Sequence, residues 1–254
     1  MNKRMIGRSE TSDFAQWPEP TILICSDPNR QVQDDYYTNG FQRWPSSNDV
    51  YLMFPSIYHR HQNYVDSELW ISRNNQQWYK FQDPLLPIEP PGMSYIGHGS
   101  WKSIGKAEKL PAWRYPMMLY KINHGVKKPA KGKFGEIRAI EWKEDRFCGL
   151  SNKKEGLSEF WTPSMLVKSK YMFLNAVIRE NGFIFIELWD DFMRKTLPGF
   201  GLDDFDEKTG DINLEQLTWN DIGDIRDFDD VHLRVRMKFK NATIFSISFR
   251  DEEN

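Results

Sequence analysis

The stretch that decides the fold runs from residue 36 to residue 81 and reads YYTNGFQRWPSSNDVYLMFPSIYHRHQNYVDSELWISRNNQQWYKF. Aromatic and aliphatic residues dominate Tyr36–Trp44 and Val50–Tyr58, and residues of these kinds are enriched in β-strands. The residues PSSND between the two runs are typical of a turn. Glu68–Arg73 alternates polar and apolar side chains, as a strand with one buried face does. The stretch therefore predicts three antiparallel strands joined by short turns.

A fourth strand is expected at Trp78–Phe81, after the polar turn Asn74–Gln77. Four short strands in about 45 residues form the repeating unit of a β-propeller, which is called a blade. Residues 82–93 are rich in proline and predict an extended connector. A second blade is predicted from the apolar and alternating runs that follow, at residues 93–99, 115–122 and 135–142.

The residues before this stretch resemble the end of a blade. Residues 9–17 and 72–78 share a pattern in which a Ser and an Asp or Asn turn precede a Trp by five or six residues. Two copies about 60 residues apart are a weak internal repeat, and repeats of this period are typical of propellers. We therefore expect the chain to start inside a blade, with earlier blades in an upstream segment or in another chain.

The pattern changes near Leu150, where short alternating runs separated by turns begin. They occur at residues 160–163, 170–177, 182–189, 213–219, 232–238 and 243–250. Six such strands in about 100 residues predict a β-sandwich. The predicted fold is therefore all-β: a partial β-propeller of about two blades plus a fragment at residues 1–150, followed by a β-sandwich at residues 151–254.

The composition excludes several classes of function. The formal net charge is −2 with both signs interspersed, so we expect no nucleic-acid partner. No run approaches the roughly 20 apolar residues of a membrane span, and residues 1–11 lack the apolar segment of a secretory signal. Cys25 and Cys148 have no metal-ligand spacing, and the sequence has no glycine-rich phosphate loop. We therefore expect no membrane span, no metal and no cofactor.

Motifs in both halves of the chain resemble those of one family. In the C-terminal half they are Phe173–Ala176, Pro198–Asp206, Thr209–Asp211, Leu217–Trp219, Val231–Arg236 and Asn241–Ile247. In the central blade they are Tyr37–Asn39, Tyr51–Ser56, Asp66 and Ser72–Arg73. This series resembles predicted bacterial glycoside hydrolases related to glycoside hydrolase family 32, which join a five-bladed propeller to a C-terminal sandwich. Together the motifs cover nearly the whole chain.

The resemblance implies chemistry on glycosidic bonds by carboxylates near the propeller axis. It also implies that this chain holds only the last blades and the sandwich, with the nucleophile of the first blade upstream. Full-length relatives are expected to be secreted or periplasmic, and the localisation of this chain stays open. The expected partner is carbohydrate.

Propeller geometry predicts which side chains share a face, because the first strand of a blade begins where the second one ends. Asp66, which matches the family motif, and Glu68 are the candidate catalytic carboxylates, since glycoside hydrolysis needs two. Asp34 and Asp35, before the first strand, are further candidates. The candidate substrate-binding residues are Tyr37, Asn39, His59, His98 and His124.

Plainer interpretations remain open for these residues. Asp66 is also suited to capping a turn, and Glu68 to the solvent-facing side of its strand. His98 and His124 lie beside glycines and are equally suited to structural loops. The first hypothesis is a glycoside-hydrolase-like protein that acts on or binds carbohydrate. The alternatives are a non-catalytic carbohydrate-binding or assembly module, which pairs with a partner through an open blade edge, and an inactive gene fragment.

Overall fold

The computed structural model describes residues 3–25, 34–44, 47, 49–60, 64–81, 92–96, 107–116, 136–143, 145–152, 156–228 and 230–251. Within these residues the fold is all-β, as predicted, apart from one short 3-10 helix, η1, at Arg226–Phe228. The chain divides into two compact units, Met1–Glu141 and Trp142–Asn254. The sequence instead predicts a boundary between residues 150 and 151. No helix in the described ranges is long and apolar enough to cross a membrane.

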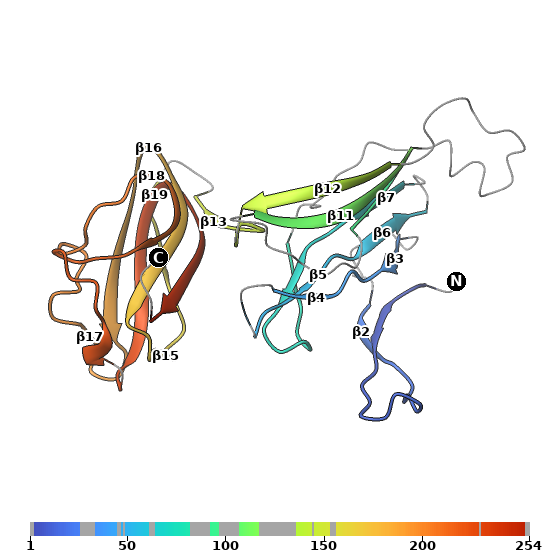
Figure 1. The fold of residues 1–254 in the computed structure, drawn as a ribbon, viewed down its shortest axis with the longest axis horizontal. Helices are drawn as coiled ribbons and strands as arrows, with labels where there is room; N and C mark the ends of the chain where they lie inside the picture. The colour runs from blue at the N-terminus through green and yellow to red at the C-terminus, as the bar shows by residue number, and fades with distance from the viewer. Residues whose placement is uncertain are drawn as a thin grey trace, which may run out of the picture. The chain divides into compact units, whose positions relative to one another are not determined.

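Within the described residues, the first unit contains three open sheets (Figure 1). Its strands are β1 (Ile6–Arg8), β2 (Thr21–Ile24), β3 (Asp34–Thr38), β4 (Gln42–Arg43), β5 (Tyr51–Met53), β6 (Ser56–His59), β7 (Tyr64–Ser67), β8 (Trp70–Ser72), β9 (Tyr79–Lys80), β10 (Gly92–Ile96), β11 (Ala107–Pro116) and β12 (Glu136–Lys143). One sheet holds only β1 and β2, a second has the order β4-β5-β8-β9, and the third has the order β12-β11-β10-β7-β6-β3.

Two of the three strands predicted between Tyr36 and Arg73 are broken at a shared bend, the first between β3 and β4 and the second between β5 and β6. The third predicted strand, Glu68–Arg73, contains β8, and β7 lies before it on the other side of the bend as a strand that the sequence did not predict. Hydrogen bonds cross the bend, because the Phe54 amide donates to the Gly40 carbonyl at 3.3 Å and the Glu68 amide donates to the Pro55 carbonyl at 2.9 Å. Gly40 has φ of 56°, and a Cβ there would lie 2.7 Å from the Phe54 oxygen. The predicted blade is therefore divided between two sheets.

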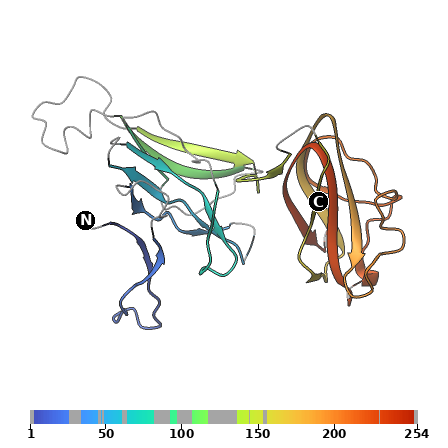
Figure 2. The same ribbon diagram turned by 180° about the vertical axis from the view of Figure 1, so that it is seen from behind.

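Two of the strands expected in a second blade, at residues 93–99 and 135–142, correspond to β10 and β12, which join one of these sheets. β11 ends where the strand expected at residues 115–122 begins, and residues 117–122 lie outside the described residues. β10 runs parallel to β7, with Met93 opposite Val65, and β11 then pairs antiparallel with β10 (Figure 2). None of the described sheets closes into a barrel. The arrangement is consistent with a partial β-propeller in the first unit.

The second unit is built on two long strands. Its elements are β13 (Leu150–Ser151), β14 (Ser158–Trp161), β15 (Met165–Leu166), β16 (Tyr171–Asp190), β17 (Lys195–Thr196), β18 (Gly210–Gln216) and β19 (His232–Arg250). β16 and β19 pair antiparallel from Tyr171 opposite Arg250 to Asp190 opposite Leu233, with a register shift between Ile178 and Phe183. Each long strand takes the place of two short strands that the sequence predicts.

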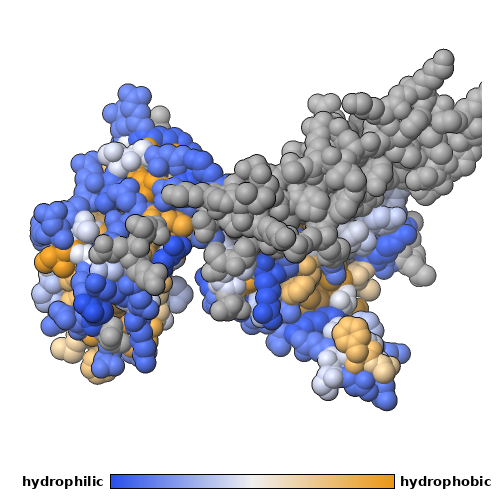
Figure 3. Space-filling model, viewed as in Figure 1, coloured by the Kyte–Doolittle hydropathy of each residue, from blue (hydrophilic) through white to orange (hydrophobic). Residues whose placement is uncertain are grey.

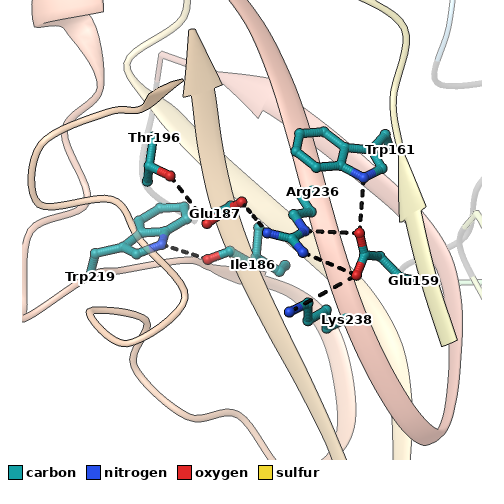
Figure 4. A network of polar contacts seen from close by, with 8 residues as sticks. All are labelled: Glu159, Trp161, Ile186, Glu187, Thr196, Trp219, Arg236 and Lys238. Carbon is teal, nitrogen blue, oxygen red and sulfur yellow. Dashed lines mark hydrogen bonds and ion pairs between the residues drawn. The ribbon is translucent and has the colours of Figure 1, made fainter. Parts of the chain in front are cut away.

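The shift divides β16 and β19 into two halves that line one core. β13 and β18 pair with one half of the long strands, while β14, β15 and β17 pair with the other half. Leu174 and Ile244 from the first half and Ile186 and Val235 from the second belong to the same buried cluster. Trp219 is fully buried in that cluster, and its Nε1 donates to the Ile186 carbonyl at 2.9 Å (Figure 4). The two halves therefore form the layers of a sandwich.

Candidate functional site

A histidine and two aspartates meet on the sheet that contains β3, β6 and β7. Asp34 lies opposite His59 in the register of β3 and β6, and Asp66 lies opposite Ile57 in that of β6 and β7. Because side chains alternate along a strand, Asp34, His59 and Asp66 point to the same face. The Nδ1 atom of His59 lies 3.1 Å from Oδ2 of Asp34, and its Nε2 atom lies 3.2 Å from Oδ2 of Asp66. We call this set the Asp34–His59–Asp66 cluster.

The Asp34–His59–Asp66 cluster is largely shielded from solvent but not sealed. The side chains of His59, Asp34 and Asp66 are 15%, 10% and 12% exposed. Tyr64 lies opposite His59 in the register, and its ring stacks on the imidazole at a centroid distance of 4.2 Å and an angle of 20°. The cluster therefore combines polar atoms with an aromatic ring at a partly open position.

Two opposing effects act on the protonation of His59. Burial is the largest single effect and lowers the pKa of His59, but contact with Asp66 and the charges of Asp66 and Asp34 together outweigh it. The net result is a pKa above the ordinary value for histidine. The Nε2 contact with Asp66 is a close charge pairing rather than a well-aligned hydrogen bond. His59 therefore keeps its proton to a higher pH in the folded protein than an ordinary histidine does.

A second charged cluster lies on the opposite face of the same sheet. Asp35 is fully buried and pairs with Arg4 and Arg60, and the Arg4 backbone amide also donates to Oδ1 of Asp35 at 3.1 Å. The Tyr37 ring lies 6.1 Å from the ring of Tyr58 and 5.0 Å from the Arg4 guanidinium carbon. Since Tyr58 precedes His59 in β6, it faces the other way. Tyr37 is therefore not part of the Asp34–His59–Asp66 cluster.

Glu68 has a different environment from the one its strand pattern indicates. Its carboxylate is buried, lies 2.7 Å from Nζ of Lys80, and accepts a hydrogen bond from Nε1 of Trp70 at 2.9 Å. The interpretation of Glu68 as a solvent-facing residue is therefore wrong. It lies at the bend between β7 and β8, where it positions Trp70 against Tyr36.

Asn39 also belongs to the bend. Its Oδ1 accepts the amide of Phe41 at 3.3 Å, which is a local turn contact beside Gly40. Of the main candidate residues named from the sequence, the structure brings together only His59 and Asp66. His98 and His124 lie outside the described residues.

Sequence reasoning named one residue of the site, Asp34, only as a further candidate, and it missed another, Tyr64. Asp34 opens β3, although an Asp-Asp pair ahead of an aromatic run also fits a solvated loop. Tyr64 stands two residues before Asp66, so it shares a face with Asp66 once both are known to lie in one strand. That period of two is the signal that identifies Tyr64.

No cluster of three or more His, Cys, Asp or Glu side chains in the described ranges is arranged to hold a metal ion. No protein-family model, no curated protein and no solved structure matches this chain. The geometry of the Asp34–His59–Asp66 cluster is therefore the basis for assigning a function.

Proposed function

We propose that this protein acts on or binds carbohydrate in the manner of a glycoside hydrolase, with the Asp34–His59–Asp66 cluster as the polar centre of its sugar site. The observation that carries the proposal is the contact of two carboxylates with one imidazole, at 3.1 and 3.2 Å, beside the ring of Tyr64. Ligand sites commonly combine a few convergent polar groups, perturbed pKa values and aromatic walls in this way.

The chemistry of the cluster matches what a sugar presents. Sugar hydroxyl groups donate hydrogen bonds, and an ionised carboxylate offers about four acceptor positions. Contact with His59 uses only part of that capacity, so Asp34 and Asp66 keep acceptors for hydroxyl groups. A ring such as that of Tyr64 offers an apolar surface with a polar tip, which suits the mixed faces of a pyranose.

The same cluster contains the parts that bond cleavage needs. Glycoside hydrolysis uses one group that donates a proton to the leaving oxygen and one ionised carboxylate. His59, whose pKa is raised by the neighbouring Asp66 and Asp34, is the group of this cluster suited to donate a proton. In this proposal Asp66 is the ionised carboxylate, and Asp34 keeps His59 charged and oriented.

One observation favours binding without catalysis as the second candidate. His59 contacts both aspartates and stands between them, whereas glycosidases flank the scissile bond with their carboxylates. The carboxylate of Glu68 is already paired with Lys80. A carbohydrate-binding module with no turnover would have the same cluster.

The test measures hydrolysis of a panel of aryl glycosides and binding of the matching free oligosaccharides by NMR titration. Asp66→Asn is expected to lower kcat/KM by at least about 100-fold, since positioned acid–base and charged groups contribute roughly 10²- to 10⁴-fold. Asp34→Asn is expected to reduce kcat/KM less and to shift the pH profile. The matched control is Asp49→Asn, because Asp49 pairs with Arg73 in an exposed turn and should leave both readouts unchanged.

The two readouts separate the candidates. Turnover that depends on Asp66 supports the enzyme. Sugar binding that Asp66→Asn abolishes, with no turnover of any glycoside, supports the binding module. Turnover unchanged in Asp66→Asn removes Asp66 from the mechanism, and failure of every sugar to bind or react overturns the proposal.

A further inference from the structure

The strand that carries Asp34 is held by few strand pairs at that end. β3 is the last strand in the order β12-β11-β10-β7-β6-β3, so among the described residues it pairs with β6 on one side only. In those residues three consecutive pairs, starting with Asp34 opposite His59, precede a register shift that follows Tyr36. A slip of one residue would turn Asp34 to the other face of the sheet, away from His59.

Asp35, the next residue along β3, is anchored on the opposite face. Nε of Arg60 donates to Oδ2 of Asp35 at 2.5 Å, and Nη2 of Arg60 contacts the same oxygen. Arg60 directly follows β6, so this ion pair joins β3 to the end of β6 where Asp34 contacts His59. The side chain of Asp35 is 1% exposed, and a buried carboxylate without a partner is costly. The pair therefore opposes any register that would move Asp35 out of reach of Arg60.

Arg4 adds a contact from outside this sheet. It lies two residues before β1, and its backbone amide donates to Oδ1 of Asp35 at 3.1 Å. Its Nη1 atom lies 3.3 Å from Oδ2 of Asp35. Figure 3 shows the hairpin of β1 and β2 projecting from the first unit, with hydrophobic colour at its end. Asp35 therefore also connects the base of this hairpin to β3.

We propose that Asp35 is the positioning residue of the candidate site: Arg60 and Arg4 hold it on one face of β3, and it thereby keeps Asp34 opposite His59 on the other face. Consecutive side chains of a strand point to opposite faces, so Asp35 lies on the far side of the sheet from a sugar at the Asp34–His59–Asp66 cluster. It acts through the position of Asp34. The consequence for sugar rests on the proposed function, whereas the consequence for His59 does not.

The direction of the effect on His59 separates positioning from the loss of a nearby charge. Among the described residues, Asp34, Asp66 and the ring of Tyr64 are the titratable groups in contact with His59. Removing the cation of Arg60 would by itself raise the pKa of His59, because a nearby positive charge disfavours the imidazolium. Loss of the contact with Asp34 would lower that pKa, because the charge of Asp34 helps to raise it. A fall in the pKa on Arg60→Gln therefore indicates positioning.

The experiment titrates the ring protons of His59 by NMR in the full-length protein without sugar. Arg60→Gln should lower the pKa of His59 by about half a unit or more, and Arg60→Lys, which keeps a charged donor, should lower it less. Arg4→Gln should also cause a smaller fall, because the Arg4 side chain is 53% exposed and its backbone hydrogen bond remains. If Arg60→Gln does not fold, Arg4→Gln carries the test. The matched control is Arg73→Gln, since Arg73 forms its ion pair in an exposed turn and should leave the pKa unchanged.

A second background shows whether the effect passes through Asp34. In Asp34→Asn the charge of Asp34 is already gone, so Arg60→Gln should no longer lower the pKa of His59. An equal fall in both backgrounds would overturn the role given to Asp34. A rise, or no change, on Arg60→Gln in the parent would overturn the proposal.

Sugar binding provides the second readout. Arg60→Gln should weaken sugar binding or turnover by roughly 10-fold or more, because a small displacement of a group in a site costs about that much. Unchanged binding in a variant whose His59 pKa has fallen would overturn the link to sugar. Failure of the parent to bind or cleave any sugar would overturn the proposed function, and the titration of His59 would still decide whether Asp35 positions Asp34.

Discussion

At the residue scale, the protonation of His59 determines what the candidate site can do. Two carboxylates contact the imidazole, so its charged form is stabilised beyond what burial removes. In its charged form His59 can serve as a hydrogen-bond donor on both nitrogens. This combination is specific to the folded chain, since the three residues come from three different strands.

We predict that the pKa of His59 in the folded protein exceeds the value of about 6.5 for an unperturbed histidine. Asp66→Asn should lower it, because Asp66 contributes more to the shift than Asp34. The measurement is an NMR titration of the His59 ring protons in the parent and in each aspartate variant. A pKa at or below 6.5 in the parent would contradict the geometry.

Stability should depend on pH through the same group. The folded pKa is raised, so the stabilisation from charged His59 is fully present below about pH 6.5 and is lost as the pH rises through the folded value. Urea unfolding of the first unit at a series of pH values should show this decline. His59→Gln should flatten it, and a decline that persists in His59→Gln would assign it to another group.

Arg236 in the second unit offers a comparison between a buried and an exposed partner (Figure 4). Its guanidinium donates to Glu187 at 2.9 Å and to Glu159 at 3.0 and 3.1 Å, and the two carboxylate side chains are 6% and 35% exposed. We predict that Glu187→Gln lowers the free energy of unfolding by about 1–3 kcal/mol, and Glu159→Gln by less than about 1 kcal/mol. Urea denaturation at 0.1 and 1 M salt checks both values, and only the effect of Glu159→Gln should shrink with salt.

At the scale of elements, the bend in β16 and β19 decides whether two strands form one layer or two. Gly182 occupies the bend, where a Cβ would lie 2.7 to 2.8 Å from three backbone carbonyl oxygens, and Asn241 opposite it has φ of 47°. Backbone atoms cannot move aside as a flexible side chain can. Only glycine at position 182 therefore allows the two strands to approach each other this closely.

We predict that Gly182→Ala lowers the free energy of unfolding by about 1–3 kcal/mol, because the added methyl group clashes with backbone. The matched control is Gly156→Ala, since a Cβ at Gly156 would have no atom within 4 Å among the described residues, and this substitution should change stability by no more than about 0.5 kcal/mol. Thermal unfolding followed by near-UV circular dichroism distinguishes them. Equal effects of the two substitutions would contradict the steric account.

At the scale of the whole molecule, the second unit contains its own core. The buried cluster around Trp219 and Ile186 draws all its members from residues 142–254. We predict that a fragment of residues 142–254 folds alone and unfolds cooperatively, since a unit with an independent hydrophobic core is a domain. Calorimetry tests this expectation, with Gly182→Ala in the fragment as an internal check that should lower the midpoint. Strong binding of a hydrophobic dye without a cooperative transition would contradict it.

The sequence by itself determined the all-β class and the places where most strands lie. Alternating side chains and turn residues are local properties of the chain, so they can be recognised without knowing which strands pair with each other. The turn repeat at Trp17 and Trp78 was visible for the same reason, because both copies use short-range hydrogen bonds. Of the candidate site, His59 and Asp66 could be named from their place near a strand end.

Only the tertiary structure decided which strands share a sheet and which side chains meet. The bend at Gly40 and Pro55, the merging of short strands into β16 and β19, and the parallel pairing of β10 with β7 depend on contacts between segments far apart in the chain. The burial of Glu68 and the meeting of Asp34 with His59 also follow from strand register, and a shift of one residue would place them on the other face. Local patterns in the sequence do not specify which residues of two strands lie opposite each other. They therefore do not show which side chains belong to the Asp34–His59–Asp66 cluster.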